Sequence, residues 1–392
     1  MLVMIVTGAV WQFVGNSVWP FFSLYVLALQ GTPEMIGIIT GIGTVASIPP
    51  AIIGGYLADI YGRKKLTAFF SIILGLTSLL MAIAFDWRML LIAVIADSLA
   101  TGFREPAMSA LIADSLSPES RGIGFLAWGI VTTVPSIVSP MIAGYMIDQS
   151  GPLLTIRWGY ALTGLAALTA GSCRYLFLSE TVRPRAREAG SVSRMTRAMM
   201  GTYRQMSRDL RVLLVSEGLV WLGWAAASPY FILYGTTDVI GLTTTEWGLI
   251  LLGSSSLRIL GFVFGPLADR YGRRNMIVAM LLLAGGSSFF FLYSKALPQV
   301  ALVFAVYSLS ILVNQQMSQA LRADVCPRED RSRVYSFFIL WQFATRTVGS
   351  ILGGFLYASV SKASPFYFQT SAMLICATVL AFTITERARR EK

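Results

Sequence analysis

The sequence predicts an all-α membrane protein with twelve transmembrane helices in two pseudo-symmetric six-helix bundles. Three observations lead to this fold class. First, 55% of the 392 residues are hydrophobic and only 13% are charged, whereas soluble domains carry about 25% charged residues. Second, the chain divides into twelve apolar segments, each close to the ~20 residues that cross a bilayer. Third, motifs of the first half recur in the second at a constant offset of 210 residues, which indicates an internal structural repeat.

Short polar breaks separate the apolar segments, and one long break divides them six from six. The segments cover 2–29, 35–58, 66–85, 89–113, 123–147, 156–178, 212–235, 245–268, 276–294, 299–322, 334–360 and 366–385. We therefore expect an N-terminal bundle over residues 1–178, a cytoplasmic linker over 179–211 and a C-terminal bundle over 212–392.

The linker has a pattern of its own. Met195, Met199, Met206 and Leu210 recur at helical spacing among arginines. This pattern is typical of an amphipathic helix that lies on an anionic membrane surface. A solvated basic linker explains the same residues equally well.

The basic residues indicate the orientation in the membrane. A net charge of +11 would suggest a nucleic-acid partner in a soluble protein. Here Lys and Arg are concentrated in alternate breaks, and the intervening breaks hold only Arg88, Arg157, Lys295 and Lys362. Because cytoplasmic loops are enriched in Lys and Arg, both termini are predicted to be cytoplasmic. We expect a monomeric, multi-pass protein of the plasma membrane that contacts lipid and no nucleic acid.

Several classes of site are not expected. The sequence has three cysteines and no histidine, so neither a disulfide framework nor a metal site is predicted. No nucleophile with its base and no nucleotide-binding loop occurs in the polar breaks, so we expect neither an enzyme nor a cofactor. The first charged residue is Glu34, and this lack of a basic leader predicts that no signal peptide is cleaved.

The internal repeat is clearest in two polar loops. Segment 55–64 reads GYLADIYGRK and segment 265–274 reads GPLADRYGRR. The same offset aligns ALIAD, which ends at Asp114, with ALRAD, which ends at Asp324. One register across separate segments indicates that the two bundles share one structure.

The loop pattern GxxxDxxGR[RK] resembles the signature loop of the major facilitator superfamily, and the chain is similar to drug/proton antiporters of that family. The resemblance implies a secondary transporter. It also implies two conformational latches that close the cytoplasmic side, formed by Asp59, Arg63 and Asp114 and by Asp269, Arg273 and Asp324. Small residues allow helices to approach closely, and glycine accepts a positive φ. Four glycines are therefore assigned to close packing or tight turns: Gly55, Gly62, Gly265 and Gly272.

In this family the first, fourth, seventh and tenth helices line the transport cavity. The candidate cavity residues are Gln12, Asn16, Arg104, Trp221, Trp224, Arg258, Asn314 and Arg346. Ionisable side chains at membrane depth usually face a cavity or a partner. The candidates for proton coupling are therefore the acids Asp97, Glu105 and Glu217.

Three of the cavity candidates are arginines near the middle of the bilayer. Arg104, Arg258 and Arg346 have only Glu105 as an acid at similar depth. Their excess positive charge favours an anionic substrate, since guanidinium binds carboxylate and phosphate groups. Alternatively, Arg104 or Arg346 pairs with Glu105 across the interface of the halves and is structural.

We therefore expect a secondary active transporter that moves a small organic solute by alternating access of its two halves. The resemblance favours proton-coupled efflux of amphipathic or drug-like compounds. The midplane arginines favour transport of an organic anion that carries a carboxylate or phosphate. A lipid flippase and a non-transporting membrane receptor are the alternatives from other classes.

Overall fold

The computed structural model describes residues 2–115, 128–180, 203, 206–257, 261, 264–327 and 331–383. This described part of the chain is helical and contains no strand, as the sequence predicts. It forms two compact units. The first unit contains residues 1–189, 235–237 and 241–252, and the second unit contains 190–234, 238–240 and 253–392. The domain boundaries at 178 and 212 stay predictions, because residues 181–202, with Met195 and Met199, lie outside the described residues.

The first unit follows the first six predicted segments. The opening segment is interrupted at Pro20, which lacks a backbone N–H and therefore weakens a helix interior; η1 lies at this point. The elements are α1 (Leu2–Val18), η1 (Trp19–Phe21), α2 (Phe22–Ala28), α3 (Pro33–Ala46), α4 (Ile48–Tyr61), α5 (Arg63–Ala82), α6 (Trp87–Asp114), η2 (Val134–Ile137), α8 (Ser139–Ser150) and α9 (Pro152–Phe177).

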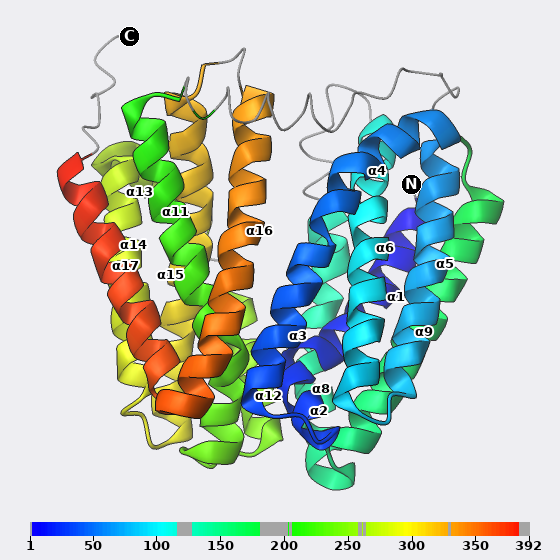
Figure 1. Cartoon of the computed structure of the whole chain (residues 1–392), viewed down its shortest axis with the longest axis horizontal. Coiled ribbons are helices and arrows are strands. Elements are labelled where there is room, and N and C mark those ends of the chain that lie inside the picture. The colour runs from blue at the N-terminus through cyan, green and yellow to red at the C-terminus, as the bar shows by residue number, and fades with distance from the viewer. Residues whose placement is uncertain are drawn as a thin grey trace. The chain divides into compact units, whose positions relative to one another are not determined.

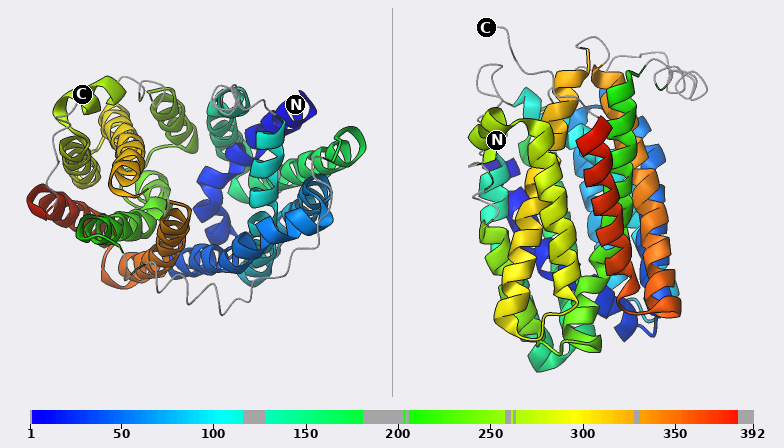
Figure 2. Two further views of the ribbon diagram at one scale, coloured as in Figure 1. Left: turned by 90° about the horizontal axis from the view of Figure 1, so that it is seen from above. Right: turned by 90° about the vertical axis from the view of Figure 1, so that its left-hand side faces the viewer.

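The second unit follows the last six predicted segments and is also helical. Helix α12 (Thr244–Leu257) begins in the first unit and ends in the second. The segment η4 (Leu233–Asp238) also has residues in both units, since 235–237 belong to the first. The other elements are α11 (Arg208–Ala227), η3 (Ser228–Tyr230), α13 (Phe264–Tyr271), α14 (Arg273–Phe291), α15 (Leu297–Val325), α16 (Arg331–Phe355), η6 (Leu356–Val360) and α17 (Ser364–Thr383). Within this unit α11 packs against α16 and α17, and α14 packs against α15 and α17 (Figures 1 and 2).

Every one of the twelve predicted segments contains at least one helix in the described part of the chain. Among the described residues, seven helical stretches are long and apolar enough to cross a membrane: Pro33–Tyr61, Arg63–Ala82, Trp128–Ser150, Arg208–Thr237, Arg273–Phe291, Leu297–Val325 and Ser364–Thr383. The all-α membrane class is thereby confirmed. The other five segments stay predictions as spans.

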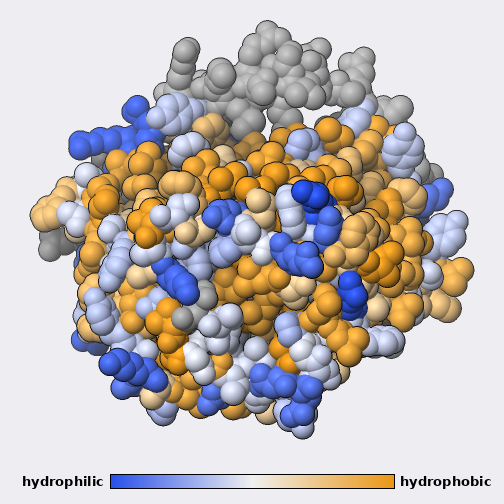
Figure 3. Space-filling view, turned by 60° about the horizontal axis from the view of Figure 1, so that its bottom comes forward, coloured by the Kyte–Doolittle hydropathy of each residue, from blue (hydrophilic) through white to orange (hydrophobic). Residues whose placement is uncertain are grey.

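Large apolar side chains are exposed on the surface of the protein. Phe85, Leu176 and Phe382 have exposed fractions of 75%, 69% and 85%, and apolar residues cover much of the face shown in Figure 3. Soluble monomers rarely expose apolar patches on this scale. Contact with lipid chains explains the surface, because lipid removes the cost of exposing these side chains to water.

The beginning of α12 shows how a helix of the second half becomes part of the first unit. Thr243 and Glu246 form a capping box: Glu246 N–H donates to Thr243 Oγ1 at 3.1 Å, and Thr243 N–H donates to Glu246 Oε2 at 2.8 Å. The next two N–H groups, of Thr244 and Thr245, donate to the carboxylate of Asp148 at 2.9 and 2.8 Å. The first N–H groups of a helix have no partner within it, so Asp148 of α8 completes the cap.

Close packing supports this contact. A Cβ added at Gly248 of α12 would lie 2.6 Å from Met141 Cα of α8. The Thr244 hydroxyl also donates to the carbonyl of Gly144 at 2.7 Å. Small residues thus bring the two backbones close enough for the carboxylate of Asp148 to reach the end of α12.

Candidate functional site

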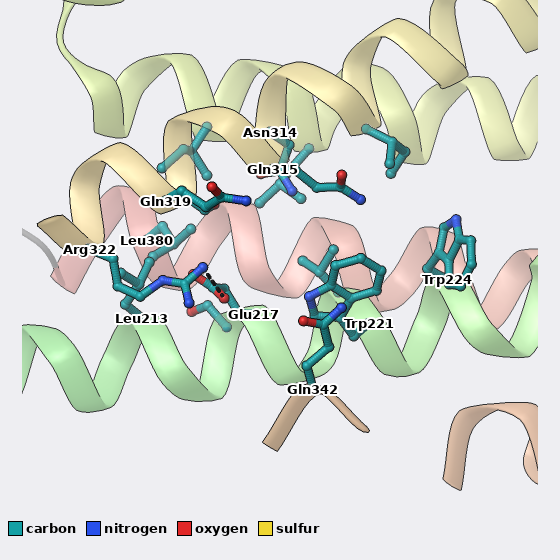
Figure 4. Close-up of a pocket in the computed structure, with 16 residues that line it drawn as sticks. Leu213, Glu217, Trp221, Trp224, Asn314, Gln315, Gln319, Arg322, Gln342 and Leu380 are labelled. Atoms are coloured by element: carbon teal, nitrogen blue, oxygen red, sulfur yellow. Dashed lines mark ion pairs between the residues drawn. The ribbon is translucent and has the colours of Figure 1, made fainter. Parts of the chain in front are cut away.

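A pocket of about 220 Å³ lies inside the second unit, between α11, α14, α15, α16 and α17 (Figure 4). Its wall is partly apolar, with leucines, isoleucines and two tryptophans. Its polar side chains are Ser216, Glu217, Asn314, Gln315, Ser318, Gln319, Arg322 and Gln342. The volume is below the roughly 300–1,000 Å³ of pockets for drug-sized ligands. A ligand of drug-like size must therefore extend beyond this pocket.

Helical periodicity places the candidate side chains on one face of α11 and one face of α15. Helix α11 carries Glu217, Trp221 and Trp224 at spacings of four and three, and α15 carries Asn314, Ser318 and Arg322 at spacings of four. Residues three and four apart share one face of a helix. The five larger side chains of these two stripes are labelled in Figure 4, and all of them line the pocket.

One ion pair joins the two stripes. Arg322 Nη2 lies 3.3 Å from Glu217 Oε2, and the two side chains are 12% and 13% exposed. The guanidinium also lies over the rings of Phe338 and Tyr335, 4.5 and 5.5 Å from their centroids. The charge of Arg322 is thus held by a carboxylate and by aromatic faces, which attract cations. Removal of the charge on Glu217 would remove this connection between α11 and α15.

The two tryptophans form a second feature of the pocket. The rings of Trp221 and Trp224 lie 5.6 Å apart with an interplanar angle of 82°. Arg346 of α16 lies over both, with its Cζ 5.6 Å and 5.2 Å from their centroids. Among the described residues, Arg346 has no acidic partner within ion-pair distance. Arg258 lies outside the described residues.

The interior of the first unit holds the other charged candidates. Arg104 forms an ion pair with its neighbour Glu105, and its Cζ lies 4.1 Å from the centroid of Trp11. The alternative prediction that Arg104 pairs with Glu105 is therefore confirmed as an ion pair. The predicted location across the interface of the halves is wrong, because both residues belong to α6 and their long side chains reach each other along one helix. The Arg104 side chain is 5% exposed and that of Glu105 is 53% exposed.

The remaining candidates of the first unit are polar residues. Asp97 accepts a hydrogen bond from the Thr77 hydroxyl at 2.8 Å, which joins α6 to α5. The Asn16 amide donates to the Ser136 hydroxyl at 3.3 Å. Gln12 is exposed. None of these residues lines the pocket of the second unit.

The loop residues assigned to the latches form ion pairs within each unit. Arg63 Nη1 lies 2.6 Å from Asp114 Oδ2, and Arg63 Nη2 lies 3.3 Å from Asp59 Oδ1. In the second unit Arg273 pairs with Asp324 and donates to the carbonyl of Ala320 at 3.0 Å. The side chain of Asp269 lies outside the described residues. The pairs tie the start of α5 to α4 and to the end of α6, and the start of α14 to α15. Their action as latches stays a prediction.

The four assigned glycines have different surroundings. Gly62 and Gly272 have φ values of 97° and 91° at the turns into α5 and α14, a region that L side chains rarely adopt. A Cβ on Gly55 would lie 3.9 Å from Pro106, which is ordinary contact. At this point of α4 the tight approach is at the neighbouring Gly54, where an added Cβ would lie 2.9 Å from the carbonyl oxygen of Phe103. The surroundings of Gly265 lie outside the described side chains.

Sequence reasoning missed Arg322. This residue is the last of the apolar segment 299–322 and lies within the ALRAD motif. On sequence alone it is therefore assigned to the basic residues of the cytoplasmic breaks. Helix α15 continues to Val325, and Arg322 lies on the same face as Asn314 and Ser318. Their spacing of four is the signal that could have identified it. Among the described residues, no group of three or more His, Cys, Asp or Glu side chains could hold a metal ion.

The sequence profile of the Major Facilitator Superfamily matches residues 1–261 and 213–392. The multidrug resistance protein MdtG of Dickeya zeae is 23% identical, over 98% of this chain and 93% of its own length. The multi-drug resistance efflux pump PmrA of Streptococcus pneumoniae is 24% identical, over 89% of this chain and 86% of its own.

Solved structures share the fold. The crystal structure of the nucleoside transporter NupG superposes with a TM-score of 0.77, at 12% identity, over 98% of this chain and 99% of that chain. Because the identity is this low, the likeness concerns the arrangement of helices. It supports the predicted fold of two six-helix bundles.

Proposed function

The chain belongs to the Major Facilitator Superfamily, and from this premise we propose that it is a proton-coupled carrier that exports small amphipathic, drug-like compounds by alternating access. The protein is a multi-pass membrane protein of a transporter family. The proposed cellular site is the plasma membrane, with both termini in the cytoplasm, and the chain acts in transport rather than catalysis. Export is supported by full-length similarity to proteins named as multidrug efflux transporters.

The observation that carries the proposal is the pocket of the second unit, in which Glu217 and Arg322 lie beside Trp221 and Trp224. Apolar and aromatic walls suit an amphipathic solute. The acid that could take up a proton lies in the same cavity and is tied to an arginine on another helix. Protonation of Glu217 removes the ion pair, and the contact between α11 and α15 then changes with it. Proton uptake and solute binding are thereby linked in one site.

The loop ion pairs fit the same cycle. Arg63 connects α4 to the end of α6 through Asp59 and Asp114, and Arg273 connects α14 to the end of α15 through Asp324. In the proposed cycle these pairs make the cytoplasmic end of each unit rigid, so that each unit moves as one body. Asp59→Asn should therefore leave expression unchanged and abolish transport. Wild-type transport by Asp59→Asn would contradict this role of the loop ion pairs.

The direct test is transport in proteoliposomes with an imposed pH gradient. We expect the protein to move an amphipathic dye, ethidium, and we expect the gradient to increase its flux at least tenfold. Glu217→Gln keeps the shape of the side chain and removes its proton exchange, so the remaining flux should no longer respond to the gradient. Glu34→Gln, at the start of α3 and outside the pocket, is the matched control and should behave as wild type. Absence of any gradient-dependent flux in the wild type would overturn the proposal.

A second candidate function has one observation in its favour. Arg346 lies against the tryptophan pair and has no acidic partner among the described residues, so it could bind a carboxylate or phosphate of an organic anion. Arg104, by contrast, is already paired with Glu105. The anion reading predicts that Arg346→Gln abolishes uptake of a labelled aromatic carboxylate, whereas the efflux reading predicts that ethidium transport survives this change.

A further inference from the structure

We propose that Arg346 competes with cationic cargo for the two tryptophans of the second unit's pocket and thereby limits how tightly the carrier binds aromatic cations. This inference rests on the proposed efflux function and adds a residue that sets the charge preference of its cargo site. It follows from where the guanidinium of Arg346 lies, from what holds it there, and from the charges that surround it.

The guanidinium of Arg346 lies at the tryptophan end of the pocket. Its Cζ is 5.6 Å from the ring centroid of Trp221 and 5.2 Å from that of Trp224, and both tryptophans line the pocket. Gln342, which also lines the pocket (Figure 4), precedes Arg346 by four residues on α16 and therefore shares its helix face. Ring faces attract cations, so an aromatic cation that stacks on the same indoles competes with Arg346 for them.

Arg346 is held less firmly than the other arginines that lie over rings inside the two units. Arg322 is paired with Glu217 at 3.3 Å, and Arg104 is paired with Glu105. Arg346 has no acid within ion-pair distance among the described residues, and the two indole rings are the partners of its charge. The residue is half-buried, so its long side chain can turn the charged end towards water. Cargo can therefore displace the guanidinium, which returns when the cargo leaves.

A cation at this end of the pocket meets unmatched positive charge. The carboxylate of Glu217 is already paired with Arg322, so it does not offset the charge of Arg346. Like charges repel more strongly in apolar surroundings than in water, and this repulsion weakens binding of an aromatic cation. An uncharged ring meets no such repulsion, and a carboxylate is attracted. A carrier must release its cargo as well as bind it, so the repulsion by Arg346 favours the release of an exported cation.

Three compounds with the ring system of ethidium test the charge preference. Phenanthridine is uncharged, 5-methylphenanthridinium is a permanent cation, and phenanthridine-6-carboxylate is an anion at pH 7. Their dissociation constants for the purified full-length protein in detergent would be measured by equilibrium dialysis. Arg346→Met keeps a long side chain and removes its charge. In this variant we expect the cation to bind about fivefold more tightly than in wild type, the carboxylate to bind about fivefold more weakly, and phenanthridine to change by less than about twofold.

Further variants separate the charge of Arg346 from other effects. Arg346→Gln is a second uncharged variant and should show the same gain for the cation, whereas Arg346→Lys keeps the charge and should bind the cation as weakly as wild type. The matched control is Arg88→Met, which removes an arginine 5.2 Å from the ring centroid of Trp87, at the start of α6 and outside the pocket, and should leave all three affinities unchanged. The inference is overturned if the uncharged variants, with wild-type melting temperatures, bind the cation no more tightly than wild type. An equal gain in Arg346→Lys also overturns it.

Parallel flux measurements separate this inference from the proposed function. If proteoliposomes export ethidium in a gradient-dependent way but Arg346→Met gains no affinity for the cation, the protein is the proposed carrier and only the role of Arg346 fails. If Arg346→Met gains affinity for the cation but the wild type moves no compound, Arg346 opposes cation binding as described and the transport proposal fails.

Discussion

The two units place different chemistry at corresponding positions. At the repeat offset, Trp11 of the first unit corresponds to Trp221 of the second, and the tryptophan is kept. Arg104 and Glu105, however, correspond to Asn314 and Gln315, so an ion pair in one unit is replaced by two amides in the other. The arginine of the ion pair in the second unit's pocket, Arg322, lies eight residues further along α15 than Asn314, roughly two helical turns away.

This shift changes what the ion pair connects. In the first unit Arg104 and Glu105 are neighbours on α6, so their pair joins no two helices. In the second unit Glu217 and Arg322 join α11 to α15. A change in the charge of Glu105 therefore acts on one helix, whereas a change in the charge of Glu217 acts on the packing of two. The two units thus share an arginine–aspartate ion pair beside their loops. The ion pairs in their interiors differ, because one lies within a helix and the other connects two helices.

The largest expected effect is on the bridge between helices. Arg322→Gln leaves the carboxylate of Glu217 mostly buried without its cation, and we expect a loss of about 3 kcal/mol in the free energy of unfolding. The measurement is thermal or denaturant unfolding in detergent. The double variant with Glu217→Gln removes both charges and should recover most of the loss. A single variant as stable as wild type would show that the pair does not hold α11 to α15.

The second effect concerns how closely the helices of the second unit pack. A Cβ on Gly353 of α16 would lie 2.6 Å from Ala226 Cα of α11, while the corresponding residue of the first unit is Ala143. Gly353→Ala should thus destabilise the protein by about 2 kcal/mol through overpacking. The control is Gly286→Ala, where nothing lies within 4 Å of the added Cβ. Equal melting temperatures of the two variants would contradict the closer packing of α16.

The smallest effect is expected in the first unit. Glu105 is 53% exposed and its partner Arg104 is 5% exposed, so water screens only one side of this ion pair. In Glu105→Gln the amide oxygen can still accept a hydrogen bond from Arg104, which also keeps its contact with Trp11, and we expect a loss of about 1 kcal/mol in the free energy of unfolding. The same unfolding measurement compares it with Arg322→Gln. A larger loss in Glu105→Gln than in Arg322→Gln would reverse the comparison of the two units.

Much of the fold follows from the sequence because lipid imposes simple rules. A run of about twenty apolar residues must form a helix in a bilayer, and the repeat at 210 residues relates one half to the other. The interior of each unit follows less simply. Arg322 is indistinguishable by composition from the topological charges around Arg328, and only the length of α15 brings it into the pocket. The pairing of Arg104 with Glu105 depends on side-chain conformation, which helical periodicity alone does not specify.

The sequence likewise predicts only part of the candidate site. Glu217, Trp221, Trp224 and Asn314 are found from the stripes that they form on their helices. Glu217 Oε1 and Asn314 Oδ1 have no hydrogen-bond partner among the described residues. Which side chains of other helices reach these oxygens cannot be predicted from the spacing of residues along one helix. Residues that share a helix face can be predicted from sequence; residues that pair between helices require the structure.

The cap that Asp148 provides for α12 also has a consequence for how the protein is made. Its partner Thr244 lies 96 residues further along the chain. At roughly 5–20 residues per second of synthesis, this carboxylate exists for about 5–20 seconds before its partners have been made. Throughout that interval the end of α8 holds a charge with nothing to cap, and assembly of the first unit waits for a helix from the second half of the chain.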